Sequence, residues 1–247
     1  MWLLADIGNT TVHVGLGSEG RILREDRFVP TERADLASFL DRFSRRARPS
    51  LEGIVVTSVR PATLEPFLAW TDGVGVKVHV AGGDLPIPLE NDYRDPRQIG
   101  LDRLVDAHAV RQRLGGDWIF VNFGTAITVD AVSADGAFHS GAILPGLWLC
   151  LNAMTQRAEQ LPAIDRIETA PFPTRSTEEA MVSGVLTGLA GMVDRIAEDL
   201  SGATGIPCRA VATGGDAKRI APRSRTIQDT IPGLTFLGLL DLVESPA

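Results

Sequence analysis

Apolar and polar residues alternate at the start of the chain in a way that predicts a β-hairpin. Residues 2–6 are mostly apolar and end in Asp6, and β-branched residues recur in alternation over residues 11–16. The stretch between them, Ile7-Gly8-Asn9-Thr10, is typical of a tight turn. We therefore expect a strand, a turn and a second strand, with Asp6 at the end of the first strand.

The same pattern returns in the second half of the chain. Residues 118–121 are apolar, residues 122–126 read Asn-Phe-Gly-Thr-Ala, and residues 127–131 continue as a second strand. Asn122 then corresponds to Asp6, a shift of 116 residues (122 minus 6) in a chain of 247. The repeat predicts an internal duplication, with an N-terminal half at residues 1–115 and a C-terminal half at residues 116–247.

The remaining pattern alternates strands with helices. Apolar spacing and the capping-box sequence Ser176-Thr177-Glu178-Glu179 indicate helices at 33–46, 101–114 and 177–200. Strands are expected at 53–58, 74–80 and 210–213, and Gly- and Pro-rich loops at 82–98 and 140–146. Two halves of this kind predict an α/β fold.

Three glycines lie on one face of the helix expected after Ser176. Gly184, Gly188 and Gly191 are spaced at i, i+4 and i+7, so this face is bare backbone. Each glycine costs about 1 kcal/mol against alanine in a helix. We therefore expect another helix or backbone segment to pack closely against it.

Composition excludes several classes of function. With 24 basic and 31 acidic residues the net charge is -7, so nucleic acid is not an expected partner. The lysines are Lys77 and Lys218, and neither belongs to a P-loop. Cys150 and Cys208 lie in no zinc or disulfide spacing, which favours the reducing cytoplasm. The start lacks a basic signal-peptide region, and the apolar stretch at 141–154 is too short to span a membrane.

Asp6 to Thr11 form the first candidate site. A tight turn at Gly8 lets backbone amides approach a polyphosphate, Thr10 and Thr11 offer hydroxyl donors, and Asp6 can hold a metal-bound water. An ordinary hairpin turn is the alternative. The repeat at Gly124 and Thr125 favours two phosphate-binding turns, and so a nucleotide-dependent phosphotransferase.

Gly100-Leu101-Asp102-Arg103 form the second candidate, where a loop meets a helix start. Asp102 can accept a proton from a substrate hydroxyl, and Arg103 can bind a substrate carboxylate. The alternative is an N-terminal capping aspartate beside a solvated arginine. Tyr93, the one tyrosine of the chain, precedes this motif. The four histidines form no metal-ligand spacing.

Together these motifs closely resemble those of type III pantothenate kinase, a member of the superfamily that contains actin and the sugar kinases. The resemblance runs nearly end to end. It rests on D-I-G-N-T at residues 6–10, Tyr93 to Pro96, G-L-D-R at 100–103 and F-G-T-A-I-T at 123–128. It continues through G-A-I-L-P-G at 141–146, L-P at 161–162, R-S-T-E-E-A-M at 175–181 and T-G-G at 213–215.

The resemblance implies duplicated ribonuclease H-like halves around a nucleotide cleft, and transfer of the ATP γ-phosphate to pantothenate, the first step of coenzyme A synthesis. It implies ATP with Mg²⁺ at Asp6, Ile7, Gly8, Asn9, Thr10, Thr11, Val12, His13 and Thr125. Pantothenate is expected at Tyr93, Gly100, Leu101, Asp102, Arg103 and Thr177, with Asp102 as the proton acceptor. A cytoplasmic homodimer is also implied.

Two positions depart from the family pattern. Asn122 stands where the family has an aspartate that binds K⁺ or NH₄⁺, so monovalent-cation affinity is expected to fall. Thr174 replaces a glycine ahead of Arg175. Asn122 motivates an alternative, a catalytically silent homologue that binds nucleotide or pantothenate as an accessory protein. A kinase for another small hydroxy acid or sugar is a third reading.

Overall fold

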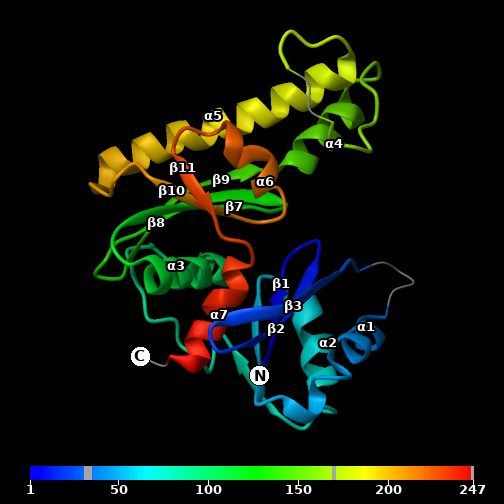
Figure 1. Cartoon of the computed structure of the whole chain (residues 1–247), viewed down its shortest axis with the longest axis vertical. Helices are drawn as coiled ribbons and strands as arrows, with labels where there is room; N and C mark the ends of the chain where they lie inside the picture. Colours follow the sequence, from blue (N-terminus) through cyan, green and yellow to red (C-terminus); the bar gives the residue numbers. More distant parts are fainter. Residues whose placement is uncertain (31–34, 169–170, 246–247) are drawn as a thin grey trace. The chain divides into compact units, whose positions relative to one another are not determined.

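The protein is described from a computed structural model that covers residues 1–30, 35–168 and 171–245 (Figure 1). The chain divides into two compact units. The first contains Met1–Gly116, Ala134–Phe138 and Gly233–Ala247, and the second contains Asp117–Ser133 and His139–Pro232.

The first unit is built on a sheet with the strand order β3-β2-β1-β4-β5. These strands are β1 (Trp2–Ile7), β2 (Val12–Ser18), β3 (Arg21–Phe28), β4 (Gly53–Ser58) and β5 (Lys77–Val80). β1, β2 and β3 are antiparallel neighbours, whereas β4 runs parallel to β1 and β5 parallel to β4. The predicted hairpin and the buried strand at 53–58 are thereby confirmed.

Helices cover both faces of this sheet. Alternate residues of β1 point to opposite faces, so Leu3 and Ala5 pack with α1 (Leu36–Ser44) and α2 (Pro61–Thr71). Leu4 packs on the other face, against α3 (Leu101–Leu114) and α7 (Leu234–Glu244). Asp6 continues the Leu4 side of the strand, and that face therefore carries the polar end of β1.

The second unit contains strands in the order β11-β10-β7-β8-β9. They are β7 (Trp118–Phe123), β8 (Ala126–Val132), β9 (Ala137–Pro145), β10 (Ala210–Thr213) and β11 (Ile227–Thr230). The short β6 (Glu90–Asn91) pairs with Ala137 and Phe138, which belong to the first unit. A core packs on one face under α4 (Leu147–Arg157), α5 (Thr177–Thr204) and α6 (Ala217–Ile220).

The two units repeat one strand arrangement. β7, β8, β9, β10 and β11 take the places of β1 to β5 in the order of their sheet. β1 and β7 each have six residues, begin with tryptophan, and share the same succession of buried and half-buried positions. The duplicated α/β fold expected from the sequence is thereby confirmed.

Some elements differ from the sequence prediction. The C-terminal segment, which the sequence assigned to the half at residues 116–247, forms α7 and belongs to the first compact unit, because Leu239 and Leu240 cover Leu4 of β1. Gly238 lies against Val105 of α3, where a side chain would collide. Residues 140–146, expected as a loop, lie largely in β9, and α1 is shorter than predicted. Residues 33 and 34 of that predicted helix fall outside the described residues.

By length and composition, α5 is apolar enough to cross a membrane, with a mean hydropathy of 1.3 over its most apolar 18 residues. Half of that window is buried inside the protein. Leu186, Leu189 and Val193 belong to the core of the second unit. This helix therefore fits the core helix of a folded domain.

Candidate functional site

The turn after β1 is held by backbone hydrogen bonds. The amide of Gly8 donates to the carbonyl of Thr11 at 3.0 Å, and the guanidinium of Arg60 donates to the carbonyl of Asn9 at 2.8 Å. Asn9 and Thr10 are exposed, Thr11 is half-buried, and His13 is exposed on β2. Ile7 and Val12 are fully buried, so only their backbone is available to a ligand.

Asp102 lies in the first turn of α3, after the capping residue Gly100. A Cβ on Gly100 would stand 2.5 Å from a carboxylate oxygen of Asp102, so glycine at this position lets the carboxylate fold back over the helix start. The same oxygen accepts a hydrogen bond of 3.0 Å from the amide of Arg103. The positive end of the helix dipole favours a carboxylate in this turn.

Asp6 and Asp102 come together within the first unit. Burial, together with the neighbouring charge of Asp102, raises the pKa of Asp6 from 3.8 to about 7. Two nearby carboxylates repel each other when both are ionised, and a cation between them relieves that repulsion. The two motifs that the sequence singled out separately therefore belong to one electrostatic site.

The donor set fits a magnesium ion bound with a nucleotide. Carboxylate oxygens are the ligands that Mg²⁺ prefers, and in nucleotide sites one or two of them suffice because phosphates and waters complete the octahedron. Among the described residues no group of three or more His, Cys, Asp or Glu side chains is placed to hold a metal alone. Asp6 would thus hold the ion together with phosphate oxygens and waters.

Arg103 differs from the solvated arginine of the alternative reading. Its side chain is only 5% exposed, and its guanidinium lies 5.6 Å from the ring centroid of Phe138. Tyr93 is half-buried, and its amide donates to the side-chain oxygen of Asn91 at 3.3 Å. Leu101, half-buried, begins α3.

The second unit has a glycine-rich edge at the end of β7. Thr125 is exposed in the turn, and its carbonyl accepts a hydrogen bond of 3.0 Å from the amide of Gly146. A Cβ on Gly146 would collide with the carbonyl of Thr125, and one on Gly214 would lie 2.5 Å from the carbonyl of Phe123. Three backbone segments therefore meet here without side chains between them, as a phosphate- or base-binding surface requires.

Asn122 is half-buried at the end of β7, opposite Thr128 of β8. Asp130 is fully buried on β8 and lies opposite Phe120 in the register of the two strands. Its carboxylate accepts a hydrogen bond of 3.1 Å from the amide of Gly141. This hydrogen bond links β8 to β9.

The start of α5 follows the predicted capping box. The hydroxyl of Ser176 accepts from the amide of Glu179 at 3.1 Å, and the carboxylate of Glu179 accepts from the amide of Arg175 at 2.6 Å. Thr177, the first helical residue, is exposed.

Sequence reasoning missed Arg60 and Thr57, which flank the turn after β1. Arg60 binds the turn, and Thr57 of β4 stands in register with Asp6. The available signal was their place at the carboxyl end of a strand parallel to β1, where ligands bind in open α/β sheets.

A family model described as type III pantothenate kinase matches residues 2–199. A type III pantothenate kinase from Geobacter sulfurreducens is 33% identical over 252 residues, covering 99% of this chain and 98% of the relative. One from Desulfovibrio desulfuricans is 36% identical over 251 residues, covering 96% and 94%.

Solved structures share the fold. A protein described as a Baf family transcriptional activator from Campylobacter jejuni aligns with a TM-score of 0.63 at 19% identity, covering 98% of this chain and 96% of that one. The ROK hexokinase from Thermus thermophilus aligns with a TM-score of 0.50 at 15% identity, with 97% of each chain covered. At these identities the likeness concerns architecture alone.

Proposed function

The chain belongs to the type III pantothenate kinase family, and we propose that it transfers the γ-phosphate of ATP to the hydroxyl of pantothenate, the first step of coenzyme A biosynthesis. The observation that carries this proposal in the structure is the juxtaposition of Asp6 and Asp102. Both lie inside the matched residues 2–199.

Asp102 is the proton acceptor in this proposal. Its carboxylate takes the proton of the pantothenate hydroxyl while that oxygen bonds to the γ-phosphorus, and the bond from phosphorus to the oxygen of ADP breaks. The products are phosphopantothenate and ADP. The start of α3 suits the role, because the helix dipole favours the ionised carboxylate that accepts the proton.

The nucleotide is assigned to both hairpins. Residues 6–13 supply the amides of the turn and the carboxylate of Asp6, and Thr125 supplies a hydroxyl from the second unit. Mg²⁺, when bound with ATP, neutralises charge on the phosphates, and Asp6 is the residue that would hold it. The closed turn at Gly8 supports this assignment, since its backbone is fixed before a ligand arrives.

Pantothenate is assigned to Tyr93, Gly100 to Arg103 and Thr177. Its carboxylate needs a cationic partner, and the planar guanidinium of Arg103 can bind it through two hydrogen bonds. The packing of Arg103 on Phe138 supports this role, because a side chain that is already ordered loses less entropy on binding.

A monovalent cation, K⁺ or NH₄⁺, is assigned to the position of Asn122. The amide of asparagine keeps a carbonyl oxygen as a ligand but carries no charge, so this site binds the cation weakly.

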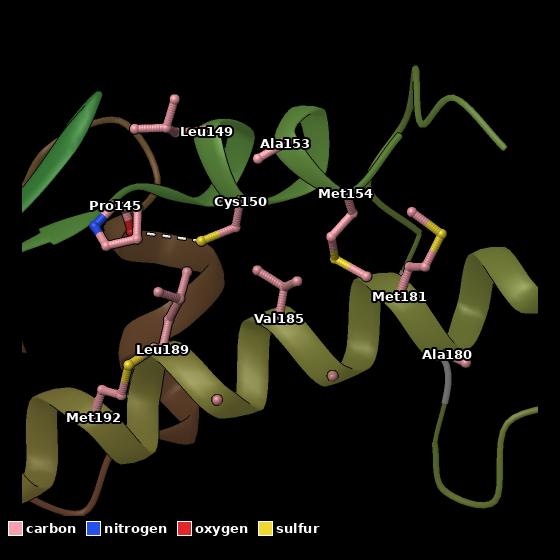
Figure 2. A pocket seen from close by; sticks show the side chains of 12 residues that line it. Pro145, Leu149, Cys150, Ala153, Met154, Ala180, Met181, Val185, Leu189 and Met192 are labelled. Carbon is pink, nitrogen blue, oxygen red and sulfur yellow. Dashed lines mark hydrogen bonds between the residues drawn. The ribbon is translucent and has the colours of Figure 1, made fainter. Parts of the chain in front are cut away.

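The interface of a homodimer is assigned to the groove between α4 and α5 (Figure 2). The groove has a volume of about 490 Å³ and is lined mainly by apolar side chains and by Gly184 and Gly188. Added Cβ atoms on those glycines would meet nothing within 4 Å, so the backbone face that was expected to be packed is open in the single chain. Leu149 and Met192 at its border are exposed. A second copy would bury this apolar surface.

The cytoplasm is the proposed compartment. Cys150 and Cys208 are both free thiols, as suits a reducing environment.

The test is phosphopantothenate formation by the purified protein with ATP and Mg²⁺, over a series of K⁺ and NH₄⁺ concentrations. We expect product from the wild type and none from Asp102→Asn, in which nucleotide binding persists. Nucleotide binding without product at any cation concentration would instead identify a catalytically silent homologue. Turnover of another hydroxy acid or a sugar in preference to pantothenate would reassign the substrate.

A further inference from the structure

Thr57 stands beside Asp6 on the neighbouring strand. β1 and β4 are parallel, and Asp6 pairs with Thr57 in their register. Two residues earlier, Leu4 and Val55 pair in the same way and share one core cluster with α3 and α7. Because side chains alternate along a strand, Asp6 and Thr57 point to that same face.

The hydroxyl of Thr57 is buried without a hydrogen-bond partner. Thr57 is 0% exposed, and among the described residues its Oγ1 and the ring nitrogens of His108 are the buried side-chain atoms that make no hydrogen bond. Leaving a buried hydroxyl unsatisfied costs about 1–3 kcal/mol, whereas valine would fill the same space without that cost. The hydroxyl of Thr57 therefore lowers the stability of the ligand-free fold, in which it makes no hydrogen bond.

The adjacent carboxylate is the partner that the geometry offers. Neighbouring strands lie about 4.8 Å apart, so a change of χ1 rotamer brings the hydroxyl of Thr57 within reach of the side chain in register with it. A hydroxyl that donates to a carboxylate stabilises its ionised form.

The internal duplication preserves this pair of positions. In the second unit β10 runs parallel to β7, and Thr213 pairs with Asn122 as Thr57 pairs with Asp6. Thr213 is also buried. A threonine therefore accompanies the polar residue at the end of the central strand in both units, next to each turn assigned to the nucleotide.

We propose that Thr57 is a positioning residue, whose hydroxyl donates to the carboxylate of Asp6 in the nucleotide-bound state and holds that carboxylate toward the metal and phosphates. The inference rests on the proposed kinase function and deepens it. Thr57 acts through Asp6 and touches no reacting atom.

Two variants at this position separate the hydroxyl from the shape of the side chain. Thr57→Val keeps the branched shape and removes the hydroxyl, and Thr57→Ser keeps the hydroxyl. The matched control is Thr71→Val, because Thr71 is buried in α2 and its hydroxyl donates to the carbonyl of Leu68 at 2.6 Å. All three are made in the full chain.

Stability and turnover are expected to move in opposite directions at Thr57. Thr57→Val should melt at or above the wild-type temperature without ligand, and its kcat should fall about tenfold with the KM for pantothenate little changed. Thr57→Ser should keep kcat within about threefold of the wild type. Thr71→Val should lose thermal stability and keep its kcat.

A second readout does not require turnover. Binding of Mg²⁺ with a non-hydrolysable ATP analogue should raise the melting temperature of the wild type and of Thr57→Ser more than that of Thr57→Val. An equal rise in all three, a wild-type kcat in Thr57→Val, or a ligand-free loss of stability like that of Thr71→Val would overturn the proposal. An inactive wild type would end the kinase assignment, and the ligand-induced shifts would still decide the role of Thr57.

Discussion

The hydroxyl of Thr235 donates a hydrogen bond of 2.6 Å to the carboxylate of Asp106, and both residues are buried. This bond ties α7 to α3 one turn beyond Asp102. A second tie lies farther along α3, where the guanidinium of Arg113 binds the carboxylate of Asp241 through bonds of 2.7 and 2.9 Å. The C-terminal helix thus fixes the helix that presents the proposed proton acceptor.

Thr235→Val should destabilise the protein, because it removes a donor from a buried carboxylate. We expect a loss of about 1–3 kcal/mol in the free energy of unfolding, measured by urea denaturation. Thr235→Ser keeps the hydroxyl and should recover most of the loss. An unchanged urea midpoint in the valine variant would show that the other partners of Asp106 satisfy it without Thr235.

Asp6→Asn should stabilise the metal-free protein at high pH while abolishing turnover. Folding raises the pKa of Asp6 to about 7, so the protonated carboxyl favours the folded state. This contribution to the free energy of unfolding is fully present below pH 3.8 and is lost as the pH rises through 7. Asparagine stays neutral throughout. At pH 8 with a chelator we expect the variant to exceed the wild type by at least about 1 kcal/mol, with the difference shrinking toward pH 4. A constant difference across this range would contradict the assigned pKa.

His108 should make the protein sensitive to mild acid. Burial, aided by the charge of Arg111, lowers the pKa of His108 from 6.5 to about 4, and the side chain is only 2% exposed. As the pH falls, the histidine is protonated in the unfolded chain at a higher pH than in the folded one. The contribution of neutral His108 to stability is therefore fully present above pH 6.5 and is lost as the pH falls through 4. The full difference corresponds to about 3 kcal/mol.

His108→Leu should reduce the loss of stability that the wild type shows as the pH falls. The loss is measured as the difference between the urea midpoints at pH 7.5 and pH 5, for the wild type and for the variant. The partly exposed His139 offers a control, and His139→Leu should leave the acid sensitivity of the wild type in place. If His108→Leu lost stability between the two pH values as steeply as the wild type, the sensitivity would arise from other groups.

The sequence predicted the elements that depend on local pattern. Both hairpins, the capped start of α5 and the helix after Gly100 follow from nearby residues, and each is present. The repeat between Asp6 and Asn122 was also visible, because a duplicated strand keeps its alternation of apolar residues.

Sequence reasoning could not predict which helices share a face of a sheet. α7 packs on the first unit because Leu239 and Leu240 contact the face of β1 that carries Leu4, and that match depends on tertiary packing. The proximity of Asp6 to Asp102 and the burial of Arg103 follow from the same packing of α3. The register that sets Thr57 beside Asp6 pairs strands far apart in the chain.

Asn122→Asp should strengthen the dependence of the enzyme on a monovalent cation. The aspartate adds a full negative charge at the end of β7, where the asparagine offers only a carbonyl oxygen. We expect the K⁺ concentration for half-maximal turnover to fall at least about tenfold, while Asn122→Ser should raise it. Identical cation curves for the wild type and the aspartate variant would separate this position from cation binding.

Gly188→Lys should yield a folded monomer. A Cβ at Gly188 meets nothing within 4 Å, and lysine is a better helix former than glycine, so the single chain tolerates the change. A charge in the middle of the apolar groove should, however, prevent a second copy from covering it. Gly202→Lys is the matched control, because Gly202 lies on the same helix, is equally open and does not line the groove. Light scattering after size exclusion should give two chains of 26.5 kDa for the wild type and for Gly202→Lys, and one for Gly188→Lys. A monomeric wild type, or a dimeric Gly188→Lys, would remove the groove from the dimer interface.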